Sequence, residues 1–439
     1  MKRPVVLGFL LINFFIICAF WWNGSGQLLT RSLGNALIAL GRLSGLLAVY
    51  FVLLQVLLIG RSVWIEKTFG LDKLSQVHRL NGKFALFFIL LHPFLLTIGY
   101  SIATRVNPVD QFLSFVTSYE AVLQAGLAVI LFVIIVFTSL YIVRSKLKYE
   151  IWYFIHLFTY LAILLAFAHQ LKNGKDFLTN SLFTYYWYGL YIFVFGNHLI
   201  FRFTRPVYLF AKHRFYVEKV IRETPDAVSI YISGKNLQDF KIDPGQFMFL
   251  RFLAKNFWWQ SHPFSLSQIP NGKNLRVTIK NSGDFTSIID QIKARTPVAV
   301  DGGYGIFTRR EAKSDKILFI AGGIGITPIR SLIEQMGRLK QHVVLIYSNK
   351  KKVDVVFKKE IDSLSKKYNL RVHYVLSQEK AAGFIHGRID TGLIARLVND
   401  LSKREIYICG PMNMINKLRQ DLIEAGITSS AIHFEKFSL

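Results

Sequence analysis

Long apolar runs fill the first half of the chain, and short alternating runs fill the second half. From about residue 211, runs rich in β-branched and aromatic residues alternate with Gly, Pro and Asn, which is typical of strands. From about residue 314, such strands alternate with helical segments, the βαβ rhythm of a parallel sheet. Each long apolar run exceeds or approaches the roughly 20 residues that cross a bilayer. These runs are residues 4–22, 33–60, 80–103, 121–143, 150–171 and 183–204.

The pattern predicts a multi-domain protein with three parts. Residues 1–210 form an all-α bundle of six transmembrane helices, 211–312 an antiparallel β-barrel, and 313–439 an α/β domain with a parallel sheet. Basic residues gather before the first run, in the second and fourth connections, and after the sixth run. The positive-inside rule therefore predicts a multi-pass protein of the cell membrane, with both termini and the second half in the cytoplasm.

Composition supports a membrane protein. Hydrophobic residues make up 52% of the chain, and the formal net charge is +26. In a membrane protein, such charge faces anionic lipid, so we expect the lipid bilayer and not nucleic acid as the partner. The two cysteines, Cys18 and Cys409, cannot build a disulfide framework, a zinc cluster or an iron–sulfur site. A metal must be held by other residues.

Four histidines form pairs in the third and fifth apolar runs. His78 and His92 are 14 residues apart, and His156 and His169 are 13 apart, or roughly 20 Å along each helix. The two runs cross the membrane in the same direction. His78 therefore faces His156 near the cytoplasmic side, and His92 faces His169 near the outer side. Facing imidazoles supply both axial ligands of a haem iron, which predicts two stacked haems, of b-type since no C-x-x-C-H motif is present. A lone membrane histidine such as His198 more often bonds a neighbour. The 13-residue spacing must be absorbed by local over- or under-winding or by helix tilt, and we expect a local distortion.

Motifs in the second half have the chemistry of nucleotide binding. In HPFSLS, a strand presents His262, Phe264 and Ser265 to a flat ligand. In KNSGDFT, Gly283 frees backbone N–H groups and Thr286 can begin a helix, which suits a pyrophosphate.

The glycine loop AGGIGITP follows a strand and permits a tight turn beside a phosphate. Thr327 is the expected helix cap, and Pro328 suits the first turn. After the next strand, YSNKKK offers Ser348 and Lys350 but no acid for a ribose 2′-OH, which favours NADPH, with NADH as the alternative.

In this order the motifs resemble the ferredoxin–NADP reductase module. Joined to six spans with paired histidines, they resemble the NADPH oxidase and ferric reductase superfamily over nearly the whole chain. The motifs that carry the resemblance are DPGQFMFL (243–250), HPFSLS (262–267), TIKNSGDFT (278–286), DGGYGIF (301–307), AGGIGITP (321–328) and YICGPMNMI (407–415).

The resemblance implies FAD on the barrel and NADPH on the α/β domain. It places Phe437 over the flavin, with Phe434 as the competing ring, and Cys409 beside the nicotinamide, with a buried structural cysteine as the alternative. The nucleotide-binding residues that it implies are Gln246, His262, Pro263, Phe264, Ser265, Thr278, Lys280, Gly283, Asp284, Thr286, Gly322, Gly323, Gly325, Ile326, Thr327, Pro328, Ser348, Lys350, Cys409, Gly410, Pro411, Met412 and Phe437.

The resemblance also implies an activity, in which electrons pass from NADPH through FAD and both haems to an outer acceptor. That acceptor is O2, giving superoxide, or a ferric chelate, or an extracytoplasmic protein served by an electron-donating subunit. Arg42 resembles an arginine that faces the outer haem in some oxidases, where it would hold a haem propionate or an anionic product; the alternative is snorkelling to the surface. Gly45 stands where that family often has a histidine, which leaves the acceptor open. With no EF-hand and no long terminal tail, we expect no obligatory protein activator.

Overall fold

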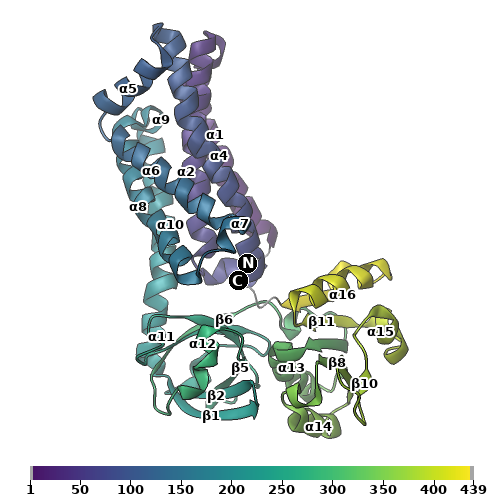
Figure 1. Cartoon of the computed structure of the whole chain (residues 1–439). Helices are drawn as coiled ribbons and strands as arrows, with labels where there is room; N and C mark the ends of the chain where they lie inside the picture. Colours follow the sequence, from purple (N-terminus) through teal and green to yellow (C-terminus); the bar gives the residue numbers. More distant parts are fainter. Residues whose placement is uncertain (1–2, 436–439) are drawn as a thin grey trace. The chain divides into compact units, whose positions relative to one another are not determined.

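The computed structural model describes residues 3–435, with long helices first and three β-sheets after them (Figure 1). By its internal contacts the chain divides into two compact units. The first unit contains the chain up to Ile65 and Lys73–Arg202, and the second contains Glu66–Asp72 and the chain from Phe203 onward. The short segment Glu66–Asp72 therefore belongs to the second unit, although it is surrounded in sequence by the first.

The first unit is helical, and Figure 1 shows its long helices side by side. Five helical stretches within residues 3–435 are long and apolar enough to cross a membrane, and they contain α1, α2, α4, α6 and α8. The sixth predicted run forms α10, which is not among these five because four tyrosines and a tryptophan lower its hydropathy; a sixth crossing stays a prediction. The helices are α1 Arg3–Ser25, α2 Leu33–Ile59, α3 Val63–Phe69, α4 Leu71–Thr104, α5 Pro108–Ser118, α6 Val122–Ser139, α7 Tyr141–Arg144, α8 Tyr149–Asn173, α9 Lys175–Leu178 and α10 Ser181–Leu199.

Glycines bring α2 and α4 close together. A Cβ on Gly34 would lie 2.9 Å from the carbonyl oxygen of Gly99, and a Cβ on Gly99 would lie 2.8 Å from the nitrogen of Ile38. Small residues at such crossings let membrane helices approach to backbone contact. This close approach places the histidine side chains of α4 within reach of α2 carbonyl groups.

The second unit begins with α11 and two antiparallel three-stranded sheets. Their strand orders are β1-β2-β5 and β4-β3-β6, and isolated bridges Tyr216↔Pro297 and Leu266↔Val277 connect them. Apolar side chains from both sheets share one core. The antiparallel sheets agree with the sequence, while closure into a barrel stays a prediction. The elements are α11 Arg205–His213, β1 Tyr216–Thr224, β2 Ala227–Ser233, β3 Phe247–Phe252, β4 His262–Ser265, β5 Asn274–Lys280, α12 Asp284–Ser287 and β6 Val298–Tyr304.

The chain ends with a six-stranded parallel sheet in the order β10-β9-β8-β7-β11-β12. Separate apolar cores lie on its two faces, as expected for a parallel sheet covered by helices. The order reverses between β7 and β11, and such a switch point is where ligands bind in α/β sheets. The elements are β7 Lys316–Gly322, α13 Ile326–Arg338, β8 His342–Asn349, α14 Lys358–Lys367, β9 Leu370–Leu376, β10 Ile385–His386, α15 Thr391–Leu397, β11 Glu405–Cys409, α16 Met412–Glu424 and β12 Ile432–Glu435.

Candidate functional site

The four predicted histidines meet in two pairs between α4 and α8. The ring centres of His78 and His156 are 6.1 Å apart, and those of His92 and His169 are 6.3 Å apart. Metal–imidazole nitrogen bonds are about 2 Å long, so two imidazoles that share one metal have ring centres about 6 Å apart. Each pair therefore has the separation that bis-imidazole ligation of a haem iron needs.

The ring nitrogens that would face away from a metal have partners. On α4, His78 Nδ1 lies 3.3 Å from the carbonyl oxygen of Gln55, and His92 Nδ1 lies 2.7 Å from that of Gly41. These two α2 carbonyls are also 14 residues apart (55 − 41), the spacing of the two histidines (92 − 78). A hydrogen bond from Nδ1–H to a carbonyl fixes the tautomer with Nε2 available to a metal and raises the basicity of the ligand.

The α8 histidines use side-chain partners instead. His156 Nδ1 lies 3.4 Å from Ser139 Oγ, which accepts a bond of 3.1 Å from Trp152 Nε1. His169 Nδ1 lies 3.3 Å from Asn173 Nδ2. The Nδ1 atoms of His78, His92 and His156 thus lie beside oxygen atoms that can accept from Nδ1–H, which leaves their Nε2 atoms for a ligand, whereas Nδ1 of His169 lies beside an amide N–H donor.

The predicted distortion of the fifth span is wrong. α8 is one uninterrupted α-helix over Tyr149–Asn173, yet both pairs meet. Since the backbone stays regular, side-chain directions and the crossing of α4 and α8 absorb the 13-residue spacing. His198, expected to be structural, lies 2.9 Å by Nε2 from the Tyr160 hydroxyl.

A cavity of about 430 Å³ adjoins the His92–His169 pair, and Arg42 is among its lining residues. Arg42 Nη1 donates to Ser25 Oγ at 3.0 Å, and the buried Ser25 hydroxyl donates to the carboxylate of Asp176. Within residues 3–435, no group of three or more His, Cys, Asp or Glu side chains is arranged to hold a metal ion. The residues present fit haem iron ligated by histidine pairs, and they do not fit a zinc site.

Most of the predicted flavin residues line a second cavity, of about 190 Å³, in the second unit. It brings together β4, β5, the region of α12, and the start of α13. The predicted residues that line it are Pro263, Phe264, Ser265, Thr278, Lys280, Thr286 and Thr327.

Four predicted flavin residues, Gln246, His262, Gly283 and Asp284, are not among the lining residues of this cavity. Gln246 is buried and braces the backbone, because its Oε1 accepts from Asp243 N at 2.9 Å and its Nε2 donates to Gly305 O at 3.0 Å. His262 Nε2 lies 2.8 Å from Gln260 Oε1, and its ring stacks on Phe285 at 4.0 Å.

The sequence predicted that Thr286 begins a helix, and this prediction is wrong. The four-residue helix α12 begins at Asp284 after Gly283, and Thr286 is its third residue. Thr286 Oγ1 accepts from the N–H groups of Ser282 and Gly283 at 2.8 and 2.9 Å. The glycine N–H that was expected to be free is therefore paired, because the threonine hydroxyl reaches back to the start of its own helix.

The glycine loop and the Cys409–Pro411 turn pack against each other at the switch point of the parallel sheet. A Cβ on Gly325 would lie 2.2 Å from the carbonyl oxygen of Cys409, and one on Gly322 would lie 2.9 Å from Pro411 Cδ. Gly323 has φ +53 and Gly410 has φ +158, conformations that favour glycine. α16 begins at Met412, directly after this turn.

Thr327 is not the cap of α13. The helix begins at Ile326 with Gly325 in the cap position, and Thr327 Oγ1 donates back to Ile324 O at 3.1 Å. Pro328 lies in the first turn, as predicted. The glycine takes the cap position because the loop must pass close to Cys409.

Cys409 is fully buried, and its Sγ donates to the Glu435 carbonyl at 3.7 Å. Burial, with the nearby Glu435 carboxylate, raises the pKa of the Cys409 thiol well above its usual value. The residue is therefore a neutral thiol at physiological pH. Phe437 lies outside the described residues. Phe434, on β12, packs against the apolar core on one face of the parallel sheet. The guanidinium of Arg419 lies 5.3 Å from the centre of its ring.

Ser348 and Asn349 end β8, and Lys350 follows them. Lys350 O accepts from Gln378 N at 3.0 Å, which joins this end of β8 to the chain after β9. Two acids that the sequence did not indicate lie nearby: Asp354 accepts from Lys351 N at 3.0 Å, and Glu379 accepts from Lys352 N at 2.8 Å.

Sequence reasoning also missed the acids of the flavin cavity. Asp72 and Glu435 line it, and the buried Glu66 accepts a bond of 2.6 Å from the Gly305 N–H. Nothing near Asp72 in the sequence resembles a nucleotide motif. Glu435, next to the C-terminal aromatics, was the one acid whose position offered a signal.

Three family models match the chain in succession. They describe a ferric reductase like transmembrane component over residues 44–167, an FAD-binding domain over 213–315 and an oxidoreductase NAD-binding domain over 319–420. The chain has the architecture of the NADPH oxidase and ferric reductase superfamily. The first match contains three of the paired histidines and ends two residues before His169. The chain thus carries a ferric-reductase-like transmembrane domain followed by FAD-binding and NAD-binding oxidoreductase domains.

Relatives match its second half. An NADPH oxidoreductase of Mycobacterium tuberculosis is 28% identical over 231 residues, 50% of this chain and 58% of the relative. The ferredoxin reductase component of a 3-ketosteroid-9-alpha-monooxygenase of Rhodococcus rhodochrous is 28% identical over 229 residues, 51% of this chain and 64% of the relative. The chain therefore spans about three fifths of these relatives. The flavohem-like FAD/NAD binding domain of a Vibrio cholerae nitric oxide dioxygenase is similar in structure, with TM-score 0.46, 19% identity, and coverage of 51% of this chain and 98% of that one.

Proposed function

We propose that this protein carries electrons from cytosolic NADPH through FAD and two b-type haems to an acceptor on the outer side of the membrane. The observation that carries the proposal is the two histidine pairs, at 6.1 and 6.3 Å, on two membrane helices of a chain that also has flavin and nicotinamide domains. A chain that only bound haem would not need those two domains. Six crossings would put both termini on the cytoplasmic side, where NADPH is made.

The residues have separate tasks in this proposal. Haem and flavin supply one-electron chemistry when bound. His78 and His156 hold the inner haem, and His92 and His169 hold the outer one. The carbonyls of α2 orient the α4 ligands, and Phe264 and Ser265 orient the flavin ring.

Oxygen, reduced to superoxide, is the acceptor that we favour. His92 and His169 would both be used to hold the outer haem, so O2 would be expected to take an electron without binding to the metal. Arg42, which lines the cavity beside that pair, offers a positive charge to a haem propionate or to the anionic product.

Ferric-chelate reduction is the second candidate, and one observation favours it. Arg42, Lys172 and Lys175 line this cavity with one acid, Asp176. Lys172 pairs with Glu120 at 3.0 Å, and the remaining excess of positive charge would attract an anionic chelate. Purified protein with NADPH, supplied in turn with a ferric chelate and with limiting oxygen, separates the two by iron(II) formation and by superoxide. Turnover only with an added periplasmic fraction would instead indicate an electron-donating subunit.

Reduced-minus-oxidised spectra test the haem assignment. Alanine at His78, His92, His156 or His169 should each lower the haem content, whereas alanine at His198 should leave both haems bound. Unchanged haem content in all four paired variants contradicts the proposal, whichever acceptor is used.

A further inference from the structure

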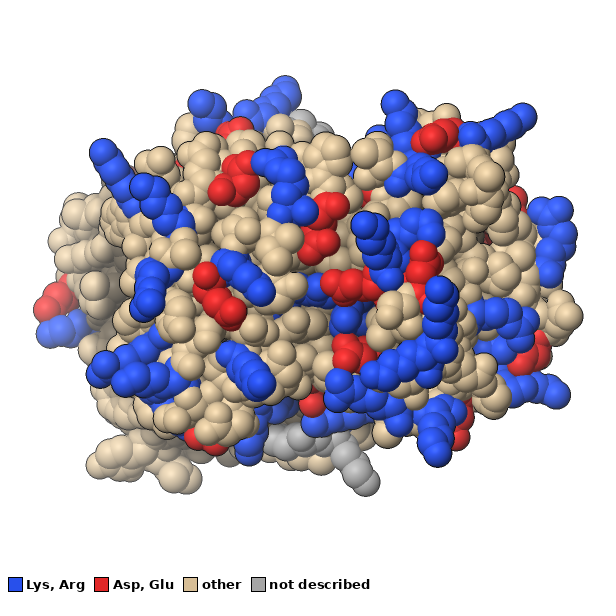
Figure 2. All heavy atoms as spheres, turned by 90° about the horizontal axis from the view of Figure 1, so that it is seen from below, with Lys and Arg blue, Asp and Glu red and all other residues tan. Residues whose placement is uncertain are grey.

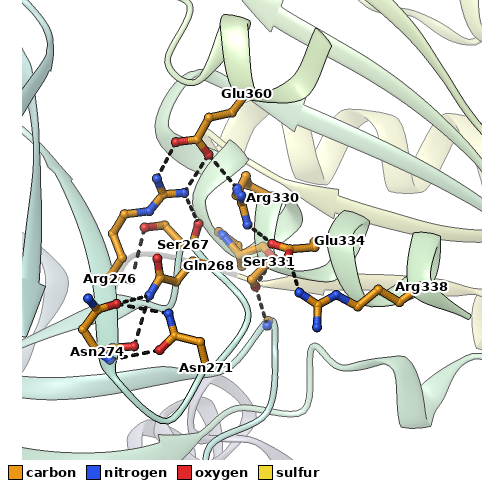
Figure 3. A network of polar contacts seen from close by, with 12 residues as sticks. Ser267, Gln268, Asn271, Asn274, Arg276, Arg330, Ser331, Glu334, Arg338 and Glu360 are labelled. Atoms are coloured by element: carbon orange, nitrogen blue, oxygen red, sulfur yellow. Dashed lines mark hydrogen bonds and ion pairs between the residues drawn. The ribbon is translucent and has the colours of Figure 1, made fainter. Parts of the chain in front are cut away.

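A buried ion network joins the antiparallel sheets to the parallel-sheet domain, and both belong to the second unit (Figure 3). Arg276 on β5 donates from Nη1 to Glu360 Oε1 at 2.6 Å and from Nη2 to Glu360 Oε2 at 3.0 Å. Glu360 belongs to α14. The pair is therefore bidentate and crosses from one sheet system to the other, the geometry in which an arginine–carboxylate pair is strongest.

Both terminal nitrogens of Arg276 have partners, while its buried Nε has none among the described residues. Its side chain is 2% exposed, Nη2 also donates to Ser267 O at 2.6 Å, and the guanidinium lies 4.4 Å from the Phe357 ring. Burial opposes the charge on Glu360, but Arg276 and then Arg330 hold the pKa of that carboxyl below its usual value. Both partners stay charged at physiological pH. Removing the Glu360 carboxylate would leave the buried Arg276 without its counter-ion, whereas Glu360 is 37% exposed and would keep Arg330 as a partner.

Glu360 also holds α13. Arg330, in the second turn of that helix, donates from Nε to Glu360 Oε2 at 2.9 Å. The next residue, Ser331, accepts from the Gly245 N–H at 2.9 Å, and Gly245 precedes β3. Adjacent residues of α13 are thus tied to the flavin side, one through Glu360 and one directly.

The position of α13 matters because its first turn belongs to the flavin cavity. Thr327 and Ile324 line that cavity, and the glycine loop at Gly323–Gly325 leads directly into the helix. The nicotinamide must reach the flavin over this turn. Hydride transfer is sensitive to placement, and a 1 Å error can cost about 100-fold in rate.

We propose that Glu360 is a positioning residue for hydride transfer, which holds α13 and its glycine loop at the correct distance from the flavin through its bonds to Arg276 and Arg330. The inference rests on the proposed transfer from NADPH to FAD and deepens it. Glu360 touches neither cofactor; it acts through α13.

The chain offers a matched control in Glu334. This acid on α13 accepts from the same Arg330, at 2.5 Å, and from Arg338, at 2.7 Å, but all three residues belong to one helix. Glu334→Gln and Glu360→Gln each remove one carboxylate from Arg330. Only the second breaks the connection to β5.

The test uses the full-length protein in lipid nanodiscs and follows flavin bleaching after anaerobic mixing with NADPH. Glu360→Gln should lower the limiting rate of flavin bleaching about 10- to 100-fold. Its FAD content should equal that of wild type. The NADPH concentration that gives half the limiting rate should change less than about threefold, because the contacts to the NADPH phosphates remain. The long-wavelength absorbance of nicotinamide stacked on flavin should weaken in parallel.

The limiting rate of Glu334→Gln should stay within about twofold of wild type, because the bond from Glu334 to Arg330 does not leave α13. Arg276→Lys, which keeps the charge but not the bidentate pair, should give an intermediate rate.

Bleaching of Glu360→Gln at the wild-type rate overturns the inference, and so does an equal loss in Glu334→Gln. If Glu360→Gln fails to bind FAD, Ser331→Ala is the test variant, because it removes the hydrogen bond between Gly245 and α13. An unchanged limiting rate and stacking absorbance in Ser331→Ala would contradict a positioning role for α13. A wild-type flavin that NADPH does not reduce would instead count against the proposed function.

Discussion

Gly45, which has no side chain, allows the His92 ring to lie close to α2. A Cβ on Gly45 would lie 2.6 Å from His92 Nδ1 and 2.7 Å from Cε1, closer than such atoms pack. Gly45 therefore makes room for the bond from His92 to the Gly41 carbonyl. A larger residue here would require the His92 ring to move.

We expect Gly45→Ala to displace the His92 ring and to lower haem content from two to about one per chain, because the outer pair loses its separation of about 6 Å. Haem-to-protein ratios after extraction measure this. Gly189→Ala is the matched control, since a Cβ on this helical glycine meets no atom within 4 Å. Full haem occupancy in Gly45→Ala would show that His92 does not need this space.

Glu66 is a second residue whose surroundings predict a measurable effect. Burial raises the pKa of its carboxyl to about 7, from 4.5, although the Gly305 N–H, Lys67 and Arg205 lower it. The folded protein therefore keeps a proton that the unfolded chain releases. Stability should fall as pH rises from about 4.5 to about 7, where the folded state binds more protons, and then level off. The difference corresponds to about 3 kcal/mol.

Glu66→Gln should flatten this pH dependence, because the amide does not titrate. The temperature at which flavin is released, measured at pH 5 and pH 8, should drop less in the variant than in the wild type. Glu311→Gln replaces an exposed carboxylate and should follow the wild-type curve. Parallel curves for wild type and Glu66→Gln would refute a raised pKa at this position.

At the scale of elements, α11 is attached to β6 by one arginine. Arg205 donates from Nη1 to Asp301 at 2.5 Å and to the Tyr304 hydroxyl at 2.8 Å, and from Nη2 to Gly302 O at 2.5 Å. The Asp301 side chain is 6% exposed. A buried carboxylate without its partner is strongly destabilising.

Arg205→Ala should therefore lower the free energy of unfolding by about 3–5 kcal/mol, seen as earlier flavin release on heating. Arg222→Ala provides the comparison, because Arg222 pairs with Asp290 at the surface, with side chains 57% and 39% exposed. Such pairs contribute about 0–1 kcal/mol. Equal losses in the two variants would mean that the Arg205 bonds stabilise no more than a surface pair.

Element boundaries also show what the sequence could predict. The spacing of 14 between His78 and His92 was enough to predict a common helix face, because helical periodicity is local. The acceptors on Gln55 and Gly41 were not predictable, since any carbonyl of α2 could serve and packing selects two. Thr286 and Thr327 failed as helix starts for a related reason. Propensity favours threonine at a cap, but close packing against Cys409 gave the cap position of α13 to Gly325. At α12 the Thr286 hydroxyl accepts from the Gly283 N–H from inside the helix instead.

At the scale of the whole molecule, the order of motifs was sufficient to predict the sequence of domains, and three family models agree with it. What was not predictable is the place of Glu66–Asp72. This segment looks like an ordinary connection between apolar runs, yet its contacts assign it to the second unit, and Asp72 lines the flavin cavity. Such contacts depend on tertiary structure, and nothing in local composition encodes them.

The charge of the whole molecule gives a test of the acceptor. The formal net charge is +26, and Lys and Arg side chains cover much of the face drawn in Figure 2. Arg42, Lys172 and Lys175 line the cavity at the His92–His169 pair, together with one acid, Asp176. An anionic ferric chelate on the outer side would be attracted by the excess of positive charge at this cavity, whereas neutral O2 would not.

Raising the salt concentration from 0.05 to 0.5 M should therefore separate the two acceptors. The Debye length is about 10 Å at 0.1 M and about 3 Å at 1 M, so attraction beyond a few ångström is screened. If a chelate is the acceptor, its rate of reduction should fall about tenfold, and Lys175→Gln should weaken the salt dependence. If O2 is the acceptor, the rate of superoxide formation should change less than about twofold, in wild type and Lys175→Gln alike. A chelate rate that ignores salt would mean that the basic residues of the cavity do not recruit it.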